Sequence, residues 1–273
     1  MPPFHRPRRI ELEYQRALDA LMRSWWKAFP HSADLETIFA YLHNGGGERV
    51  IQASERLARA MVTQTAVQNA VSWRDAARKS SQGKRIYDLL RSEMAGPVGG
   101  VMRGLVSQHA KLVRSLPQDI AQDVAGQIAT RQMRGERAEA IAKDIGSRLP
   151  GIAKSRIALI ARTQVSVTAE SITRARAQNL GANWYSWLSS EDSRVRPSHR
   201  KMDQVLVRWD DPPSPELLVN EKFVGRYNAG NVFNCRCTSA PIIDLDEITF
   251  PAKVFYRGTI TRMGRAKFQQ IAA

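Results

Sequence analysis

The 273-residue sequence has little cysteine, few aromatic residues and no long apolar run. Its two cysteines, Cys235 and Cys237, stand one residue apart, which is too close for the Cα and Cβ separations that disulfides prefer. A disulfide-built fold is excluded, and we expect a reduced pair. The best apolar run, residues 157–161, falls far short of the ~18 residues that a membrane span needs. No apolar segment follows the basic N-terminus, so we expect no secretory signal.

Several common catalytic motifs are also missing from the sequence. It contains no G-x-x-x-x-G-K-[ST] phosphate loop, no G-x-S-x-G nucleophile elbow and no H-E-x-x-H zinc motif. These absences argue against the commonest nucleotide-binding, hydrolase and zinc-protease functions.

Basic residues, in contrast, are in large excess. Lys and Arg number 41 against 26 Asp and Glu, a formal net charge of +15. Such a charge predicts a polyanionic neighbour, usually nucleic acid, although an acidic membrane surface or protein would be attracted by the same field. Residues 1–9, expected as an extended arm, and 250–273 contain no acid. The predicted nucleic-acid contacts lie in these two segments: Arg6, Arg8, Arg9, Lys253, Arg257, Arg262, Arg265 and Lys267.

The first 180 residues have the apolar spacing of helices. The predicted helices cover residues 10–29, about 35–42, 48–79, 84–94, 101–116, 117 onward, 138–145 and 156–180. Pro117 is expected in the first turn of a new helix, where its missing N–H costs nothing. Residues 149–151 are expected to end one helix, and Ser155 to cap the next.

After Gly181 the sequence becomes richer in aromatic and β-branched residues, which favours strands. We predict strands at 184–188, 205–209, near Phe223, at 237–241 and at 254–256, with a short helix over 197–202. The predicted fold class is α+β, mainly helical in the first two-thirds and followed by a small mixed α+β unit. The predicted domains are a helical region with a basic arm (1–115), a signature domain (116–245) and a basic tail (246–273).

The most informative segment runs from A-R-T-Q at 161–164 to the proline at 241. Its landmarks are D-S-R-V-R-P-S-H at 192–199 and Y-N-A-G-N-V-F-N-C-R-C at 227–237. In this order they resemble the phage Mu F-like head morphogenesis family, whose members are minor capsid proteins, and the resemblance covers about residues 116–241. The signature residues that it identifies are Arg162, Thr163, Asp192, Arg194, Arg196, His199, Asn234, Cys235, Arg236 and Cys237.

The sequence departs from this family pattern at three places. Gln164 stands where the family usually has glutamate, which removes a salt bridge or catalytic role at that position. Residues 202–204 lack the glycine that commonly follows the histidine-bearing helix. Phe233 and Asn234 replace a histidine often found before C-R-C, so a metal site has fewer ligands here.

Two interpretations fit the cysteine pair. On a strand, residues two apart point to the same face, so Cys235 and Cys237 could join His199 and Asp192 as a four-ligand zinc set. However, structural zinc sites favour C-x₂₋₄-C over C-x-C, and free cysteines are often small buried hydrophobes. We favour the second interpretation, with no cofactor; zinc is the alternative.

The charged residues of 192–199 also allow two roles. In the favoured, structural role, Asp192 caps the turn before residue 197 or pairs with Arg194 or Arg196, and so fixes the loop against Arg236. In the catalytic role, His199 is a general acid/base and the arginines clamp a phosphate, as in a nuclease. The second acid or base of a nuclease is lacking, since Glu191 is expected to be solvated.

Trp184 and Trp187 lie three residues apart on a predicted strand and therefore on opposite faces. At most one is expected to face a core. The other could stack on a nucleic-acid base, although burial against the C-R-C segment is favoured.

The resemblance implies a structural protein rather than an enzyme, located in the virion or prohead interior after synthesis in the host cytoplasm. Its implied partners are the portal or inner capsid, with a role in DNA packaging or ejection. The basic segments would contact double-stranded phage DNA through phosphates, without sequence specificity. The alternatives are a nuclease-type phosphoryl-transfer domain centred on His199, Arg196 and Asp192, and a general nucleic-acid-binding module.

Overall fold

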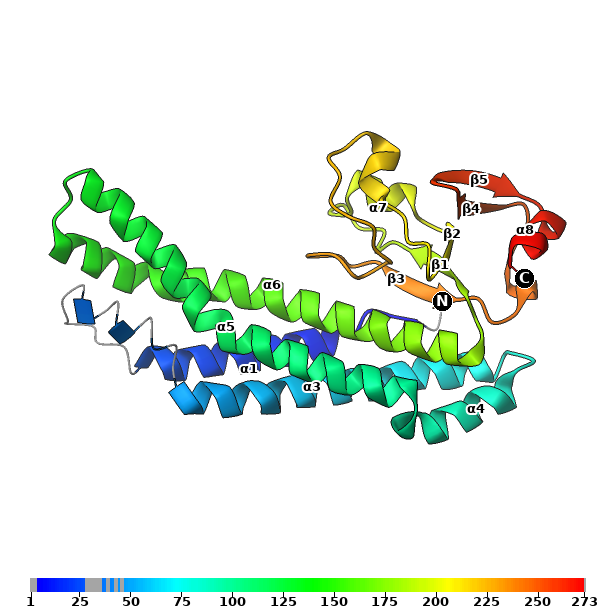
Figure 1. Cartoon of the computed structure of the whole chain (residues 1–273), viewed down its shortest axis with the longest axis horizontal. Helices are drawn as coiled ribbons and strands as arrows, with labels where there is room; N and C mark the ends of the chain where they lie inside the picture. The colour runs from blue at the N-terminus through cyan, green and yellow to red at the C-terminus, as the bar shows by residue number, and fades with distance from the viewer. Residues whose placement is uncertain (1–3, 28–35, 38–39, 42–43, 45–46, 273) are drawn as a thin grey trace. The chain divides into compact units, whose positions relative to one another are not determined.

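The computed structural model describes residues 4–27, 36–37, 40–41, 44 and 47–272. The chain divides into two compact units (Figure 1). Unit 1 comprises Met1–Arg8, Thr63–Arg103 and Thr163–Ala273, and unit 2 comprises Arg9–Val62 and Gly104–Arg162. The predicted α+β class is confirmed, with helices in the first two-thirds and a small mixed sheet after them.

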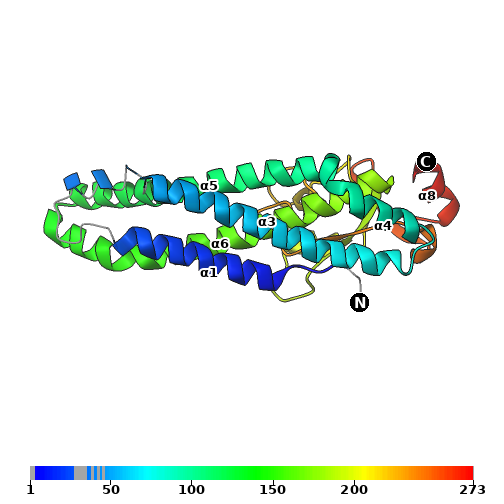
Figure 2. The ribbon, with the colours of Figure 1, turned by 90° about the horizontal axis from the view of Figure 1, so that it is seen from below.

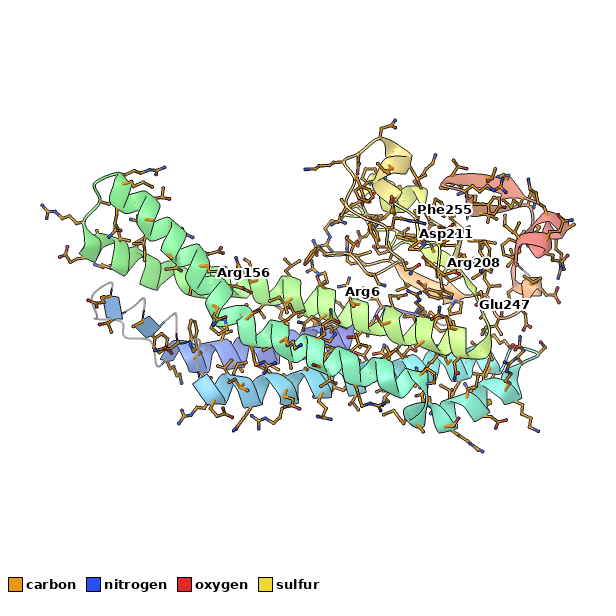
Figure 3. The ribbon with its side chains drawn as sticks, viewed as in Figure 1. Arg6, Arg156, Arg208, Asp211, Glu247 and Phe255 are labelled. Carbon is orange, nitrogen blue, oxygen red and sulfur yellow. The ribbon has the colours of Figure 1, made fainter. Side chains whose placement is uncertain are left out.

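Unit 2 is helical. It contains α1 (Arg8–Lys27) from residue 9, the first part of α3 (Gly47–Ala77), the second part of α5 (Pro97–Met133) and the first part of α6 (Ala138–Leu180) (Figure 2). The predicted stripe on α5 is fully buried: Leu116, Ile120, Val124 and Ile128. Arg156 of α6 pairs with Asp123 of α5 (Figure 3). None of the described helices has the length and apolarity to cross a bilayer.

Two predicted helix boundaries in this part of the chain were wrong. Helix α5 continues through Pro117, and α6 continues through residues 149–151. The Ser155 hydroxyl donates to the Gly151 carbonyl at 3.4 Å inside α6 instead of capping a helix. An interior proline lowers the stability of a helix by about 3 kcal/mol. The hydrophobic stabilisation from the complete burial of Leu116 and Ile120, on either side of Pro117, outweighs this loss. The short helix predicted at about 35–42 falls mostly outside the described residues.

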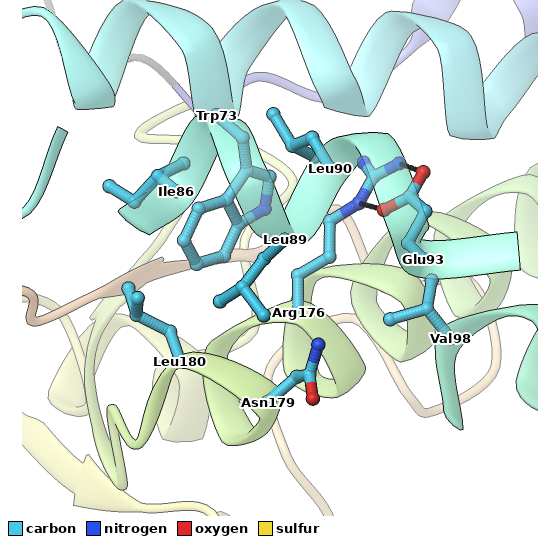
Figure 4. Close-up of a pocket in the computed structure, with 9 residues that line it drawn as sticks. All are labelled: Trp73, Ile86, Leu89, Leu90, Glu93, Val98, Arg176, Asn179 and Leu180. Carbon is cyan, nitrogen blue, oxygen red and sulfur yellow. Dashed lines mark hydrogen bonds and ion pairs between the residues drawn. The ribbon is translucent and has the colours of Figure 1, made fainter. Parts of the chain in front are cut away.

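The helical part of unit 1 is held by a buried arginine. Arg176 on α6 forms a bidentate ion pair with Glu93 of η1 (Glu93–Ala95), at 2.6 and 2.8 Å (Figure 4). It also donates to Asn69 on α3 at 2.6 Å. Beside them is a cavity of about 10 Å³, whose lining includes Trp73 and residues of α4 (Gly83–Ser92). The positive charge of Arg176 is thus balanced by the Glu93 carboxylate, as a buried ion pair requires.

A five-stranded sheet forms the rest of unit 1, in the order β3-β1-β2-β4-β5. Its neighbouring strands are antiparallel except β2 and β4, which are parallel. The strands are β1 (Trp184–Leu188), β2 (Leu206–Arg208), β3 (Thr238–Pro241), β4 (Ala252–Tyr256) and β5 (Thr259–Met263). The short helices are α7 (Pro197–Lys201), η2 (Pro215–Val219), η3 (Leu245–Glu247) and α8 (Arg265–Ala272).

The predicted strand near Phe223 was wrong, because residues 221–228 form no regular element. The sequence also did not predict β5 and α8. Residues expected as part of a basic tail form the β4–β5 hairpin and α8, whose Phe268 is fully buried. Apolar positions in this segment alternate with Lys253, Arg262 and Lys267, and this mixture hid the strands.

Both faces of the sheet are covered. Two buried clusters cover these faces, which we call the cysteine-side core and the Trp184-side core. The cysteine-side core contains Tyr185, Trp187, Val205, Val207, Cys235 and Cys237, together with helix residues such as Trp73 and Leu180. The Trp184-side core contains Trp184, Leu206, Ala252, Val254, Met263 and Phe268.

The expectation that at most one of the two tryptophans faces a core was therefore wrong. Trp187 is buried in the cysteine-side core, and Trp184 packs edge-on against Phe268 with ring centroids 5.0 Å apart. Neither ring is exposed for stacking on a base. The missing element in the prediction was α8, which covers the second face.

The extended N-terminal arm also differs from the prediction. Phe4 is buried in unit 1, where it meets Trp73 edge-on at 5.4 Å, and helix α1 already begins at Arg8. The Phe4 side chain thus packs the described part of this segment onto unit 1.

Candidate functional site

The centre of the candidate site is His199 on α7. Pro197 occupies the first turn of this helix, and the imidazole is 3% exposed, edge-on to Trp187. Its Nε2 lies 3.0 Å from the Tyr227 hydroxyl, which in turn donates to Glu216. Because the tyrosine proton is directed at Glu216, Nε2 carries the imidazole proton and donates it to Tyr227. The Nδ1 lone pair then faces the other way, toward the cysteines.

The two cysteines approach His199 from the segment just before β3. Burial alternates along this segment: Cys235, Cys237 and Ser239 point inward, and Arg236 and Thr238 are partly exposed. Nδ1 of His199 lies 3.5 Å from Sγ of Cys235 and 3.4 Å from Sγ of Cys237. The three ligand atoms all lie within 4.8 Å of one another. The same-face placement expected from C-R-C is thus observed, and both cysteines are buried.

The two thiols are coupled. A hydrogen bond from Cys237 holds the pKa of Cys235 well below its usual value although burial opposes this. The same hydrogen bond and burial raise the pKa of Cys237. This hydrogen bond therefore shifts the pKa values of the two thiols in opposite directions.

A buried carboxyl group lies on the helix side of this segment. Glu170 of α6 accepts a hydrogen bond from the Ser239 backbone N–H at 3.0 Å, and burial raises the pKa of its carboxyl group to about 8. Gly230 passes over it with a φ of +76°, and a Cβ there would lie 2.4 Å from Glu170 Cγ. Only glycine fits this position without displacing the buried glutamate.

Asp192 does not join the cluster. Its carboxylate forms a bidentate pair with the Arg236 guanidinium, whose Nη2 lies 2.8 Å from Oδ1, and it accepts the Arg194 backbone N–H at 2.9 Å. Arg196 donates to the Phe233 carbonyl at 2.9 Å. These contacts tie the D-S-R-V-R loop to the C-R-C segment. Of the four residues proposed as zinc ligands, the structure brings together His199, Cys235 and Cys237 only.

The remaining signature residues lie around this centre or away from it. Thr163 accepts the Asn234 backbone N–H through its hydroxyl oxygen at 3.3 Å, and Asn234 adopts a positive φ of 59° that turns the chain into Cys235. Arg162 lies in unit 2, where its Nε is 3.5 Å from a Glu11 carboxylate oxygen.

The geometry does not favour phosphoryl transfer. His199, Arg196 and Asp192 have separate partners: the cysteines and Tyr227, the Phe233 carbonyl, and Arg236. A general acid/base must reach the substrate proton within about 3.2 Å or through one water, and a ring that is 3% exposed with both nitrogens engaged offers little access.

Sequence reasoning did not single out Tyr227, Glu216, Glu170 or Gly230. Tyr227 and Gly230 belong to the Y-N-A-G-N motif, which was the available signal. No such signal marked Glu170 or Glu216, because their roles depend on tertiary contacts with Ser239 and Tyr227.

The basic residues predicted to contact nucleic acid are distributed over both units. Lys253 and Arg262 are exposed directly opposite each other on the β4–β5 hairpin, and Arg257 lies over the Tyr256 ring at 5.2 Å. Others already have acidic partners: Arg9 pairs with Glu13, and Arg265 with Asp246. Arg8 and Lys267 are exposed and Arg6 is half-buried.

Unit 1 thus combines a small α+β sheet with a buried cluster of one histidine and two cysteines. Comparison with known proteins agrees with the motif order: residues 122–240 match the family model described as "Phage Mu protein F like protein". This match covers less than half of the chain, and it confirms the family resemblance over that segment.

One curated relative comes from Haemophilus influenzae and is described as an "Uncharacterized protein". It is 27% identical to this chain over 149 residues, which is 54% of the chain. The match spans only 30% of the relative's own length. No solved structure matches the chain.

Proposed function

We propose that this protein is a structural minor head protein of a tailed phage, which acts in head assembly at the portal or inner capsid and resides inside the virion or prohead. The observation that carries the proposal is the family match over residues 122–240. The structure adds that the motifs within this segment form one contact network, in which Arg236 holds Asp192 and the cysteines meet His199. In this role the network stabilises the fold, and the surfaces around it bind partners.

The decisive experiment for this proposal is the location of the chain in particles. We expect the chain in purified proheads and heads of the phage that encodes it, with cross-links to portal or inner-capsid subunits. Heads that lack the chain, or cross-links to tail proteins alone, would contradict the proposal.

The proposed contact with packaged DNA rests on charge. The net charge is +15, and Lys253 and Arg262 face each other across two strands. Like charges directly opposite each other destabilise a sheet, and a neighbouring anion would offset this repulsion. Phosphate groups along double-stranded DNA supply such anions at regular spacing.

Salt dependence of DNA binding tests the charge argument. We expect the wild-type affinity to fall steeply between low and moderate salt, and the triple variant Lys253→Gln, Arg257→Gln, Arg262→Gln to lower the logarithmic slope by about one for each phosphate contact removed. The matched control is Arg265→Gln, because Arg265 already pairs with Asp246 and should change the slope less. Equal effects of the control and a single hairpin substitution would argue against a hairpin contact. DNA binding without particle association would favour a general nucleic-acid-binding module.

A further inference from the structure

We propose that His199 Nδ1, Cys235 Sγ and Cys237 Sγ bind one zinc ion, which fastens α7 to the segment before β3. This site is independent of the proposed head function. Its ligands come from α7, which precedes β2, and from the end of the proline-containing segment between β2 and β3. The zinc ion would close the residues from 199 to 235 into a loop.

The distances fit a tetrahedral ion. Zinc lies at about 2.3 Å from a thiolate sulfur and 2.0–2.1 Å from an imidazole nitrogen, so tetrahedral angles place nitrogen and sulfur about 3.6 Å apart. The two measured Nδ1–Sγ distances are 3.5 and 3.4 Å. Both cysteines also lie on the buried side of their segment, while Arg236 between them pairs with Asp192.

Charge and burial agree with this assignment. Cys235 and Cys237 are each 2% exposed, and two thiolates without a counter-charge would be costly at such a depth. A divalent cation neutralises both. Without the ion, the same atoms have only weak thiol hydrogen bonds at 3.4–3.5 Å.

The groups around the ligands are arranged as in a metal site. A ligating histidine normally donates its other N–H to a fixed acceptor, and here Tyr227 and then Glu216 form that chain beyond Nε2. The Cys237 backbone N–H points at Cys235 Sγ at 3.5 Å, which favours a thiolate there. Asp192 is occupied by Arg236, so the fourth coordination position is open to water or another small ligand.

Zinc content of the untagged, full-length chain tests the site. We expect about one equivalent of zinc per chain by elemental analysis of wild-type protein produced with zinc. The single variant His199→Gln and the double variant Cys235→Ser, Cys237→Ser should each hold less than a tenth of that amount. Two controls should retain zinc: Asp192→Asn, which alters a neighbouring charge, and His109→Gln, which alters the other buried histidine of the described residues.

A wild-type zinc content below about half an equivalent would overturn the proposal. So would equal loss in the controls and in the ligand variants. If a ligand variant does not fold, the wild type still decides the matter: a high-affinity chelator should lower its thermal midpoint, and added zinc should restore it. A midpoint that is indifferent to both reagents would count against the site. These results are obtained on the isolated chain and do not depend on whether it enters a phage head.

Discussion

The two cores that cover the faces of the unit 1 sheet are both buried but differ in the side chains that fill them. The Trp184-side core is built from apolar side chains, among them Val254, Met263 and Phe268. The cysteine-side core is equally buried but encloses polar groups as well, including His199, Glu170 and the two cysteines.

An apolar core needs no external component, because burial of hydrophobic surface alone stabilises it. A core with buried polar groups requires a partner for each of them. Arg176 and Glu93 meet that requirement within the protein, whereas under our proposal a zinc ion meets it for the two thiols and the imidazole. The Trp184-side core should therefore be indifferent to zinc, and the cysteine-side core dependent on it.

The largest effect is expected from Phe268→Ala, which should lower the free energy of unfolding by about 3–5 kcal/mol because it empties a fully buried site against Trp184. Urea denaturation measures the loss, and zinc content should not change. A loss under about 1 kcal/mol would show that residues 265–272 are a dispensable tail.

Gly230→Ala should cost about 2–5 kcal/mol, since its Cβ would overlap Glu170 Cγ and its φ is positive. The matched control is Gly258→Ala in the β4–β5 turn, where φ is +80° and the space is open, so only about 1–2 kcal/mol of backbone strain is expected. Denaturation midpoints of the two variants separate the contact with Glu170 from backbone strain alone. Equal losses would mean that the contact with Glu170 is unimportant.

Tyr227→Phe should cost about 1–3 kcal/mol because it leaves His199 Nε2 and Glu216 without the shared hydroxyl. We also expect zinc affinity to fall by about 10–100-fold, as for other groups that orient a ligating histidine. Tyr185→Phe is the control: its hydroxyl bonds to Asn228 and Ala229, so stability should fall while zinc affinity stays constant. Competition with a chromophoric chelator measures the affinity, and similar affinities for both variants would separate Tyr227 from the site.

The smallest effect concerns the outer surface of the hairpin. Lys253→Glu would place an acid opposite Arg262 and should raise stability by about 0.2–1 kcal/mol while it weakens DNA binding. Thermal melts and DNA titration at one fixed salt concentration provide the two readouts. Unchanged DNA affinity would place the contact surface elsewhere.

These comparisons also show what could be predicted from the sequence. The two sulfurs were placed on one face because alternation along a strand is a local property, and the structure has them there. The strands predicted at 184–188 and 205–209 were found from their aromatic and β-branched residues, and the structure has β1 at Trp184–Leu188 and β2 at Leu206–Arg208. Local signals failed where burial decided the outcome, as at Pro117 and residues 149–151, which stay inside long helices.

Partners that are distant in sequence could not be assigned from sequence alone. Asp192 was proposed as a zinc ligand, as the cap of the turn before residue 197, or as a partner of Arg194 or Arg196 that fixes the loop against Arg236. Its carboxylate accepts the Arg194 backbone N–H, and it fixes the loop through a direct ion pair with the Arg236 guanidinium that the sequence did not assign. Tyr227 belongs to the Y-N-A-G-N motif, but the sequence did not assign its partners. Glu216 and Glu170 carry no distinctive local pattern, so these contacts emerge only in the folded chain. The second sheet face was missed because its apolar residues are interspersed with basic ones in 250–273.

Zinc K-edge X-ray absorption of the purified, untagged chain tests the dependence of the cysteine-side core on metal most directly. We predict two sulfur scatterers at about 2.3 Å and a histidine nitrogen at about 2.0–2.1 Å, with one further light ligand. Cys235→Ser should replace one sulfur by a lighter atom or abolish the signal. A first shell of oxygen and nitrogen only, or no bound zinc at all, would contradict the proposed difference between the two faces of the sheet.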